Sequence, residues 1–236
     1  MKYKAVIFDL FETLITEWGH EKYTKNEMCA DIGIERARFD VFWDEKAQDR
    51  YTGSISFEDS ILYVCERCGK SIDDAAISNI IEKRIKTKSV CFEYVRPEIF
   101  RLLRTLREKG LKTAIISNCS SEEVKVLKGS EIYKYFDEVV LSYEVHMKKP
   151  DSGIYEEASK RLGVGLRECI FVGDGGSNEL VGAETVGMKA IQAKWYTNQY
   201  PKKRDSINGF PVAEEPADIM KHIEKIVKDD IYCLTE

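Results

Sequence analysis

The sequence lacks the patterns that mark membrane-spanning and exported chains. It has no uninterrupted apolar stretch long enough to cross a bilayer. The apolar run from Ala5 to Phe8 is short and ends at the acid Asp9, which is unlike a signal peptide. Internal repeats and low-complexity segments are also missing. These absences lead us to expect a cytoplasmic protein with no membrane partner.

An excess of positive charge is missing as well. The 236 residues carry a formal net charge of -5, which argues against nucleic acid as the main partner. Hydrophobic residues make up 43% and charged residues 33%, a balance typical of a soluble globular protein. A chain of this length can bury a real core, either as one large domain or as a domain with an insertion.

The cysteines lack the pattern of a disulfide framework or a zinc site. Their number is seven, which is odd, and no export signal accompanies them, so we expect free thiols. Cys65 and Cys68 form a single CxxC, with no second CxxC or HxxxH to complete four zinc ligands. The pair lies in a helical pattern rather than beside a βαβ unit, so a redox role is not favoured either.

What the sequence does contain is a short buried-strand pattern, Val6 to Phe8, that ends at Asp9. A continuous apolar run suits a strand covered on both faces of a parallel sheet. Ligands bind at the carboxyl ends of such strands, which makes Asp9 a candidate nucleophile. An acid that merely turns the chain after a strand would give the same pattern.

The rest of the chain divides into two kinds of pattern. Residues 17–88 show about four amphipathic helices and no convincing strand, as in a small helical bundle. After Pro97, strands and helices alternate, with strands expected at 111–116, 138–142, 168–172 and 188–193. This alternation predicts an α/β fold with a doubly wound, Rossmann-like parallel sheet. We expect a core of residues 1–16 and 89–236, with a four-helix cap of residues 17–88 as a lid.

The polar segment from Tyr196 to Glu215 reads as a surface loop, with a basic run at Lys202, Lys203 and Arg204. A last amphipathic helix is expected at 217–227.

Polar groups end three of the predicted strands: Asp9, then Ser117 with Asn118, then Asp174. Lys149 stands just before a helix that enters from the same edge of the sheet. Each residue alone has an ordinary explanation as a cap, a turn residue or a solvated cation. Their recurrence at one edge favours a common site.

These segments resemble the haloacid dehalogenase superfamily of hydrolases, in the subclass with a helical cap inserted after the first strand. The resemblance rests on four stretches in the family's order and spacing: Phe8 to Leu14, Ile116 to Asn118, Lys149 to Asp151 with Tyr155, and Val172 to Glu179 followed by Gly182-Ala183 and Gly187-Met188.

The resemblance implies a role for each matched residue. Asp9 attacks phosphorus and forms an aspartyl intermediate, and Mg2+ is held by Asp9, Asp174 and the backbone carbonyl of Phe11. Lys149 screens the charges, and Ser117, with nearby backbone N–H groups, hydrogen-bonds the transferring oxygens. Asn118, next to Ser117 in the same stretch, is expected among the catalytic residues. Thr13 fixes the loop, and Glu179 orients a metal-bound water. Phe11 and Tyr155 are expected to contact the substrate, a small phosphorylated metabolite or another small anion. From its place in the cap, Arg50 is expected to bind an anion.

Phe11 departs from the phosphatase pattern, because that position normally carries an Asp that acts as general acid and base. Its loss is expected to slow ester cleavage, and Glu12 is expected to point elsewhere. Aromatic residues at this position, and Tyr155, are features of metal-independent 2-haloacid dehalogenases, which lack an acid at the position of Asp174. A Mg2+-dependent phosphate hydrolase is therefore ranked first, a dehalogenase second, and a weakly catalytic binding or regulatory protein third. The chain is expected to be a monomer or homodimer.

Overall fold

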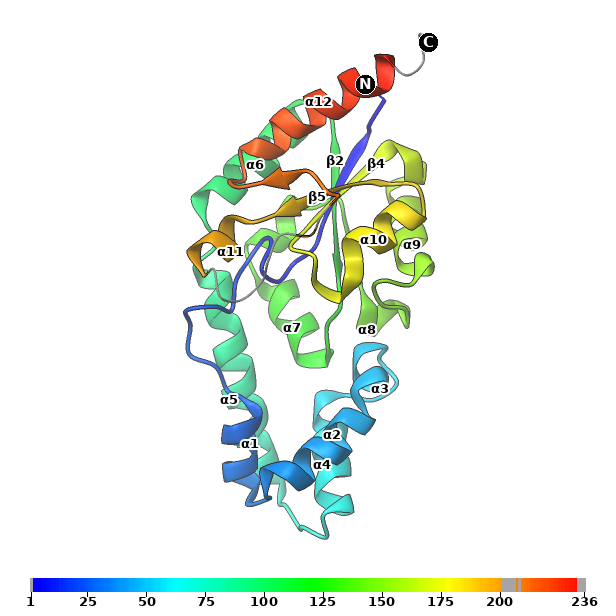
Figure 1. Cartoon of the computed structure of the whole chain (residues 1–236). Helices are drawn as coiled ribbons and strands as arrows, with labels where there is room; N and C mark the ends of the chain where they lie inside the picture. Colours follow the sequence, from blue (N-terminus) through cyan, green and yellow to red (C-terminus); the bar gives the residue numbers. More distant parts are fainter. Residues whose placement is uncertain (1, 201–206, 208, 233–236) are drawn as a thin grey trace.

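The chain is built around one parallel sheet, seen edge-on in the computed structural model, which describes residues 2–200, 207 and 209–232 (Figure 1). Six strands run in the order β3-β2-β1-β4-β5-β6, and each neighbouring pair is parallel. Their bounds are β1 Ala5–Phe8, β2 Lys112–Ser117, β3 Glu138–Leu141, β4 Cys169–Gly173, β5 Lys189–Ala193 and β6 Val212–Ala213. The chain builds outward from β1 to β3, then returns to place β4 on the other side of β1. The order of the strands reverses between β1 and β4. The chain therefore leaves the carboxyl ends of these two strands in different directions, and a crevice lies between them.

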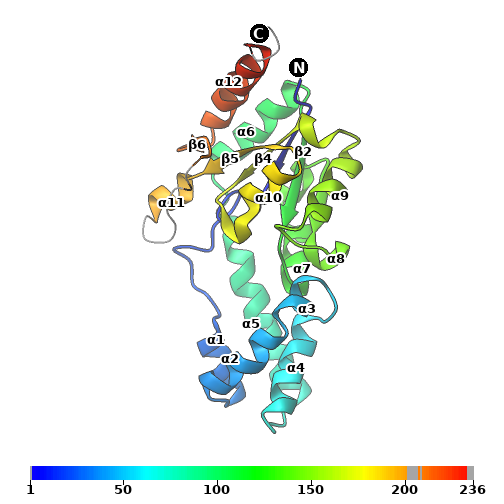
Figure 2. The same ribbon diagram turned by 45° about the vertical axis from the view of Figure 1, so that its right-hand side comes forward.

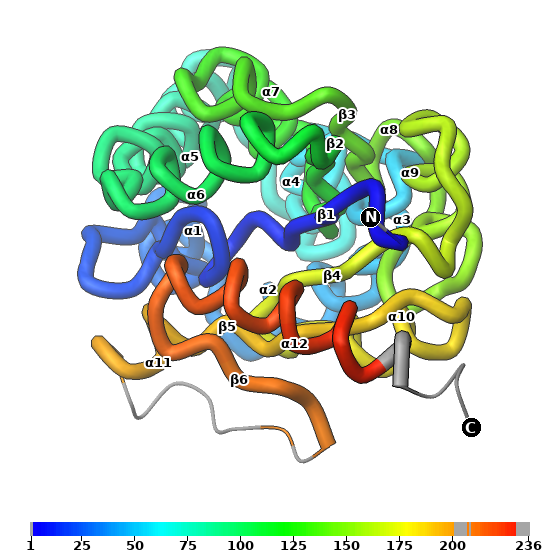
Figure 3. The backbone as a smooth tube through the Cα atoms, turned by 90° about the horizontal axis from the view of Figure 1, so that it is seen from above, coloured from blue at the N-terminus to red at the C-terminus, as the bar shows by residue number. Residues whose placement is uncertain are grey.

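Helices cover both faces of the sheet, as Figure 3 shows from above. Val6 and Phe8 of β1 join one apolar cluster with α6 Pro97–Glu108, α7 Ser121–Gly129 and α12 Asp218–Tyr232. Ala5 and Ile7 point to the opposite face and join a second cluster with α9 Ser152–Leu162 and α10 Glu179–Thr185. Successive residues of a strand point to opposite faces, so both faces of β1 are apolar. The predicted doubly wound α/β core is confirmed.

A second group of helices lies beyond the carboxyl ends of the strands (Figure 1). It consists of α1 Lys25–Ile32, α2 Arg36–Glu45, α3 Ala47–Tyr51, α4 Phe57–Arg67 and α5 Asp74–Glu93. These are five helices rather than the expected four, because the short α3 is a separate turn after α2. α4 begins as predicted, with the Ser56 hydroxyl accepting a hydrogen bond from the Asp59 N–H.

The helical group has a core of its own, which includes Phe39, Trp43, Phe57 and Ile61. Figure 2 shows the chain running between it and the sheet along two segments, the stretch after β1 and the upper part of α5. Residue 88, the predicted end of the cap, falls inside α5, which continues to Glu93. The division into a core of 1–16 and 89–236 and a cap of 17–88 stays a prediction.

The segment expected to be a surface loop from Tyr196 to Glu215 is partly regular, so that prediction is wrong in two places. α11 spans Trp195–Gln199, and β6 pairs with β5. Trp195 and Tyr196 are buried in the apolar cluster that contains Val6 and Phe8, and the Trp195 indole Nε1–H donates to the Thr13 carbonyl at 2.8 Å. Pro201 and the basic run at 202–204 lie outside the described residues.

The remaining short elements are α8 Ser142–Val145 and the 3-10 turns Ile132–Tyr135, Leu166–Glu168 and Gly176–Asn178. Six cysteines are free thiols, and Cys233 lies outside the described residues. In the part of the chain that the structure describes, no helix has the length and apolar character to cross a membrane.

Candidate active site

Three buried carboxylates converge at the switch point of the sheet. Asp9 follows β1, Asp174 follows β4, and Glu179 begins α10. The Asp9 N–H donates to the Val172 carbonyl at 2.9 Å, which ties the end of β1 to the end of β4. One carboxylate oxygen from each of the three acids lies within 4.8 Å of the others. This is the arrangement of oxygen ligands that a hard divalent cation prefers.

Lys149 is the counter-charge inside this cluster. Its Nζ donates to Asp9 Oδ1 and, at 2.5 Å, to Glu179 Oε2. Burial alone would lower the pKa of this ammonium, but the Asp9 and Glu179 carboxylates raise it above the usual range, so Lys149 stays charged. Burial and the charge of Asp9 raise the pKa of Glu179 to about 8. Lys149 thus pairs with two of the three acids, Asp9 and Glu179, and Asp174 is the third acid of the cluster.

Asn118 holds the backbone of Lys149 with two hydrogen bonds. Its side-chain amide donates to the Lys149 carbonyl at 3.0 Å and its Oδ1 accepts from the Lys149 N–H at 2.8 Å. The segment after β2 therefore fixes the lysine that follows β3. The hydroxyls of Ser117 and Thr13 are buried and have no hydrogen-bond partner among the described residues. Buried hydroxyls are normally paired, so these two are candidates to bind a ligand oxygen.

The crevice above these groups has a volume of about 180 Å3, and its lining includes Asp9, Phe11, Lys149, Asp174 and Glu179. Phe11 places an apolar ring in the crevice, at the position where the resemblance to phosphatases predicts a general acid. Glu12 also lines the crevice, but its carboxylate accepts hydrogen bonds from the Thr16 hydroxyl and, at 3.2 Å, from the Glu17 N–H. Burial raises the pKa of Glu12 to about 7.

Two expected substrate contacts lie elsewhere. Arg50 is buried among the cap helices, where its Nη1 donates to the Trp43 carbonyl at 2.6 Å and its guanidinium stacks 3.8 Å from the Trp43 ring centroid. Tyr155 is fully buried, and its hydroxyl donates to the Glu179 carbonyl at 2.9 Å. Neither residue lines the crevice. Tyr155 supports the backbone of Glu179, and Arg50 supports the cap.

Several residues that support the site were missed from the sequence. The Gly175 N–H donates to Glu179 Oε1 at 3.1 Å, and the Gln192 side-chain amide donates to the Asp174 carbonyl at 3.1 Å. Gly175 adopts φ 98°, a conformation that glycine reaches without strain. Trp195, on α11, contacts the segment after β1, where its indole donates to the Thr13 carbonyl. Of these residues, only Gln192 could have been found from the sequence, because a polar Gln stands inside the apolar strand β5.

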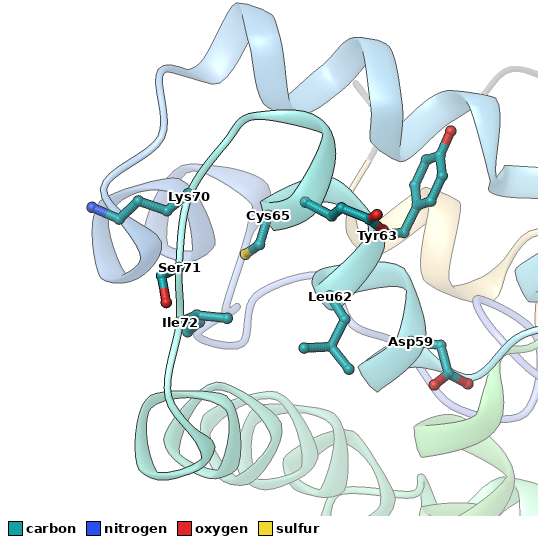
Figure 4. Close-up of a pocket in the computed structure, with 8 residues that line it drawn as sticks. Asp59, Leu62, Tyr63, Cys65, Lys70, Ser71 and Ile72 are labelled. Carbon is teal, nitrogen blue, oxygen red and sulfur yellow. The ribbon is translucent and has the colours of Figure 1, made fainter.

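A separate cavity of about 460 Å3 lies on the cap, between α4 and the segment that follows it (Figure 4). Two of its polar side chains have partners within the cap: Asp59 accepts from the Ser56 hydroxyl, and the Tyr63 hydroxyl donates to Glu45. Burial raises the pKa of the Cys65 thiol. Among the described residues, Cys65 and Cys68 belong to no cluster of three metal-ligating side chains.

Comparison with known proteins gives a consistent family match. Residues 3–187 match the model of the haloacid dehalogenase-like hydrolases. A glyceraldehyde 3-phosphate phosphatase of Methanopyrus kandleri is 30% identical over 96% of this chain and 99% of its own length. An (S)-2-haloacid dehalogenase of Pseudomonas fluorescens is 27% identical over 72% of this chain and 75% of its own.

Solved structures share the fold at lower identity. A 2-haloacid dehalogenase of Pseudomonas syringae superposes with a TM-score of 0.65 at 19% identity, covering 94% of this chain and 99% of that one. A haloacid dehalogenase family enzyme of Bacteroides thetaiotaomicron, determined as a magnesium complex, gives 0.62 at 22% identity and covers 81% of this chain and 93% of that one.

Proposed function

Because the chain belongs to the haloacid dehalogenase-like hydrolases, we propose that it is a Mg2+-dependent hydrolase of small phosphate monoesters, with Asp9 as its nucleophile. The observation that carries the proposal is the charge of the site. Three buried acids surround one ammonium, and even with Glu179 protonated the carboxylates of Asp9 and Asp174 outnumber it. A dianionic phosphate is therefore repelled from the cluster unless a further cation is bound.

The donor set fits Mg2+, since it consists of oxygen atoms alone. We assign Asp9, Asp174 and the backbone carbonyl of Phe11 as ligands, with Glu179 beside them as a residue that orients metal-bound water. When bound, Mg2+ supplies positive charge that neutralises the phosphate oxygens and the carboxylates around them.

In the proposed reaction, an Asp9 carboxylate oxygen attacks the phosphorus atom, and the bond from phosphorus to the ester oxygen breaks. The alcohol leaves after its oxygen takes a proton from water, since Phe11 has none to give. Water then attacks the phosphoryl group on Asp9, which releases inorganic phosphate and restores the carboxylate. Phe11 makes the first step slow, because general acid catalysis typically contributes about 10²–10⁴-fold.

The other matched residues have supporting roles in this proposal. Lys149 neutralises Asp9 and the incoming phosphate, and Asn118 holds the Lys149 backbone. The hydroxyl of Ser117 binds a transferring oxygen, and Thr13 fixes the loop after β1. Helices α1 to α5 act as a lid that excludes water from the crevice. The substrate is a small phosphorylated metabolite, the site of action is the cytoplasm, and the chain acts as a monomer or homodimer.

A second candidate, the metal-independent 2-haloacid dehalogenase, is favoured by the aromatic ring of Phe11. Relatives of both kinds cover most of the chain. Asp174 counts against it, because an additional carboxylate repels a haloacid substrate unless a cation lies between them. A weakly catalytic binding protein is the third candidate and rests on Phe11 alone.

The test is a panel of phosphate monoesters, including glyceraldehyde 3-phosphate, and of 2-haloacids, each with Mg2+ and with EDTA. We expect phosphate release that requires Mg2+ and that Asp9→Asn abolishes, with a phosphoryl adduct on Asp9 detected by mass spectrometry of the acid-quenched enzyme. Asp44→Asn, at an exposed acid of α2, is the matched control and keeps full activity. Halide release in EDTA would establish the dehalogenase instead, and turnover unchanged in Asp9→Asn would exclude Asp9 as nucleophile.

A further inference from the structure

A second cavity of about 470 Å3 adjoins the crevice and shares Asn118, Lys149 and Ser177 with it. Tyr51, Lys148 and Pro150 complete its lining. Pockets for small molecules usually measure roughly 300–1,000 Å3, so the crevice alone is too small for a whole metabolite. Its volume of about 180 Å3 suits a phosphoryl group with its cation, whereas the second cavity has room for the alcohol of the ester.

The lining of the second cavity contains two lysines and no carboxylate. Lys149 Nζ donates to Asp9 and Glu179, so its charge serves the crevice rather than the second cavity. Lys148 makes no ion pair with any described residue, although its side chain is half-buried. Its ammonium is therefore the charge in this cavity that still lacks a counter-ion. An anion placed there is attracted more strongly than at an open surface, because less water screens the pair.

Tyr51 is the residue that the cap contributes to this cavity. It is the last residue of α3, and the two residues that follow it contact the core at and just after α8, which lies next to α3 in Figure 1. The carbonyl of Thr52 accepts a hydrogen bond from His146 Nδ1 at 2.6 Å. Gly53 has φ 72°, and a Cβ built on it would lie 2.0 Å from the Tyr143 carbonyl oxygen. The cap backbone thus presses directly on the core at this point. A tyrosine hydroxyl has an ordinary pKa of about 10, so Tyr51 is protonated at neutral pH and able to donate a hydrogen bond.

We propose that Lys148 and Tyr51 select phosphate monoesters whose alcohol carries a carboxylate, that is, phosphorylated hydroxy acids. The inference rests on the proposed phosphatase function and adds the substrate class. A single uncompensated ammonium balances one negative charge. A carboxylate carries one charge, whereas a second phosphoryl group carries about 1.5 to 2 at neutral pH, so the carboxylate matches better. Lys148 binds the carboxylate, and the Tyr51 hydroxyl donates a hydrogen bond to it.

The experiment compares kcat/KM for 3-phosphoglycerate, glycerol 3-phosphate and a diol bisphosphate of the same chain length, in the presence of Mg2+. The first two substrates differ at one carbon, which is a carboxylate in one and a neutral alcohol in the other. We expect wild type to prefer 3-phosphoglycerate about tenfold. Lys148→Met should reduce that ratio to about one, Lys148→Arg should retain most of it, and Tyr51→Phe should reduce it by about threefold. Lys160→Met, at an exposed lysine of α9 outside both cavities, is the control and keeps the wild-type ratio.

A measurement on wild type alone provides an independent check: glycerate should inhibit phosphate release at a lower concentration than glycerol does. Equal kcat/KM for the acidic and neutral esters, a preference for the bisphosphate, or a ratio unchanged by Lys148→Met would overturn the selection of hydroxy acids while leaving the phosphatase intact. Absence of Mg2+-dependent hydrolysis of any phosphate ester would instead remove the proposed function itself.

Discussion

The ammonium of Lys88, on α5, lies 4.9 Å from the centroid of the Phe11 ring. The same Nζ pairs with Glu17, in the segment after β1, and with Glu123, in the first turn of α7, at 2.5 Å in each case. Lys88 and Glu123 are both buried. This one side chain therefore joins the two segments that connect the cap to the sheet, and it does so beside the residue that departs from the phosphatase pattern.

Replacing Lys88 should destabilise the protein strongly. Lys88→Met leaves the buried Glu123 carboxylate without its main partner, and loss of one member of a buried pair typically costs about 3–5 kcal/mol. Equilibrium unfolding in urea at pH 7 measures the change. Lys83→Met is the control, because Lys83 lies on the same helix in an exposed pair with Asp31, where about 0–1 kcal/mol is expected. Equal losses in the two variants would mean that burial adds nothing to the Lys88 pair.

Gly53 offers a test of the contact between the cap and α8. Gly53→Ala places a Cβ 2.0 Å from the Tyr143 carbonyl oxygen, so the segment that carries Tyr51 has to move away from the core. We expect KM for a phosphate ester to rise about tenfold, which corresponds to about 1.4 kcal/mol of binding. Gly69→Ala is the matched control: Gly69 has φ 64° with no atom within 4 Å, so the variant carries the backbone strain without the clash. A KM that rises equally in both variants would attribute the effect to strain alone.

The sequence was informative where function and fold depend on short local patterns. Continuous apolar runs located β1, β2, β4 and β5, and the polar residues after them identified Asp9, Asn118 and Asp174 as neighbours. It failed where a contact joins distant segments. The Trp195 indole donates to the Thr13 carbonyl, 182 positions away, and a turn-rich composition hid the helix that carries Trp195. Arg50 looked like an anion-binding residue because nothing in the sequence shows that Trp43 stacks on it.

Glu122 should make stability depend on pH. Burial and the neighbouring charge of Glu123 raise its pKa, although Arg84 lies 3.2 Å away and opposes the shift. An acid with a raised pKa stays protonated to higher pH in the folded state than in the unfolded state. The free energy of unfolding therefore falls as pH rises above the unfolded pKa of about 4.5. The Glu122→Gln side chain cannot ionise, so this variant does not lose stability in that way. The difference in unfolding free energy, variant minus wild type, should therefore increase between pH 4.5 and pH 8, as measured by urea titrations. A difference that is constant with pH, or that moves in favour of wild type, would contradict the assigned direction.

Phe11→Asp should raise phosphate-ester hydrolysis, because it supplies a proton donor that the crevice lacks. The side chain at position 11 already lines the crevice with Asp9, so the new carboxyl group lies beside the reacting atoms. Protonation of the leaving oxygen is typically worth about 10²–10⁴-fold, and we expect kcat to rise by about 10²-fold, the lower end of that range. The lower end is chosen because the Lys88 ammonium, 4.9 Å from the present ring, favours the ionised form of the new acid. Phe11→Asn is the control, since an amide of nearly the same shape cannot transfer the proton.

The gain should be largest for esters of weakly acidic alcohols, whose oxygens need protonation most, and small for p-nitrophenyl phosphate. If the Asp and Asn variants turn over alkyl esters at the same rate, proton transfer does not limit this enzyme, and the slow step lies in binding or in release of phosphate from Asp9.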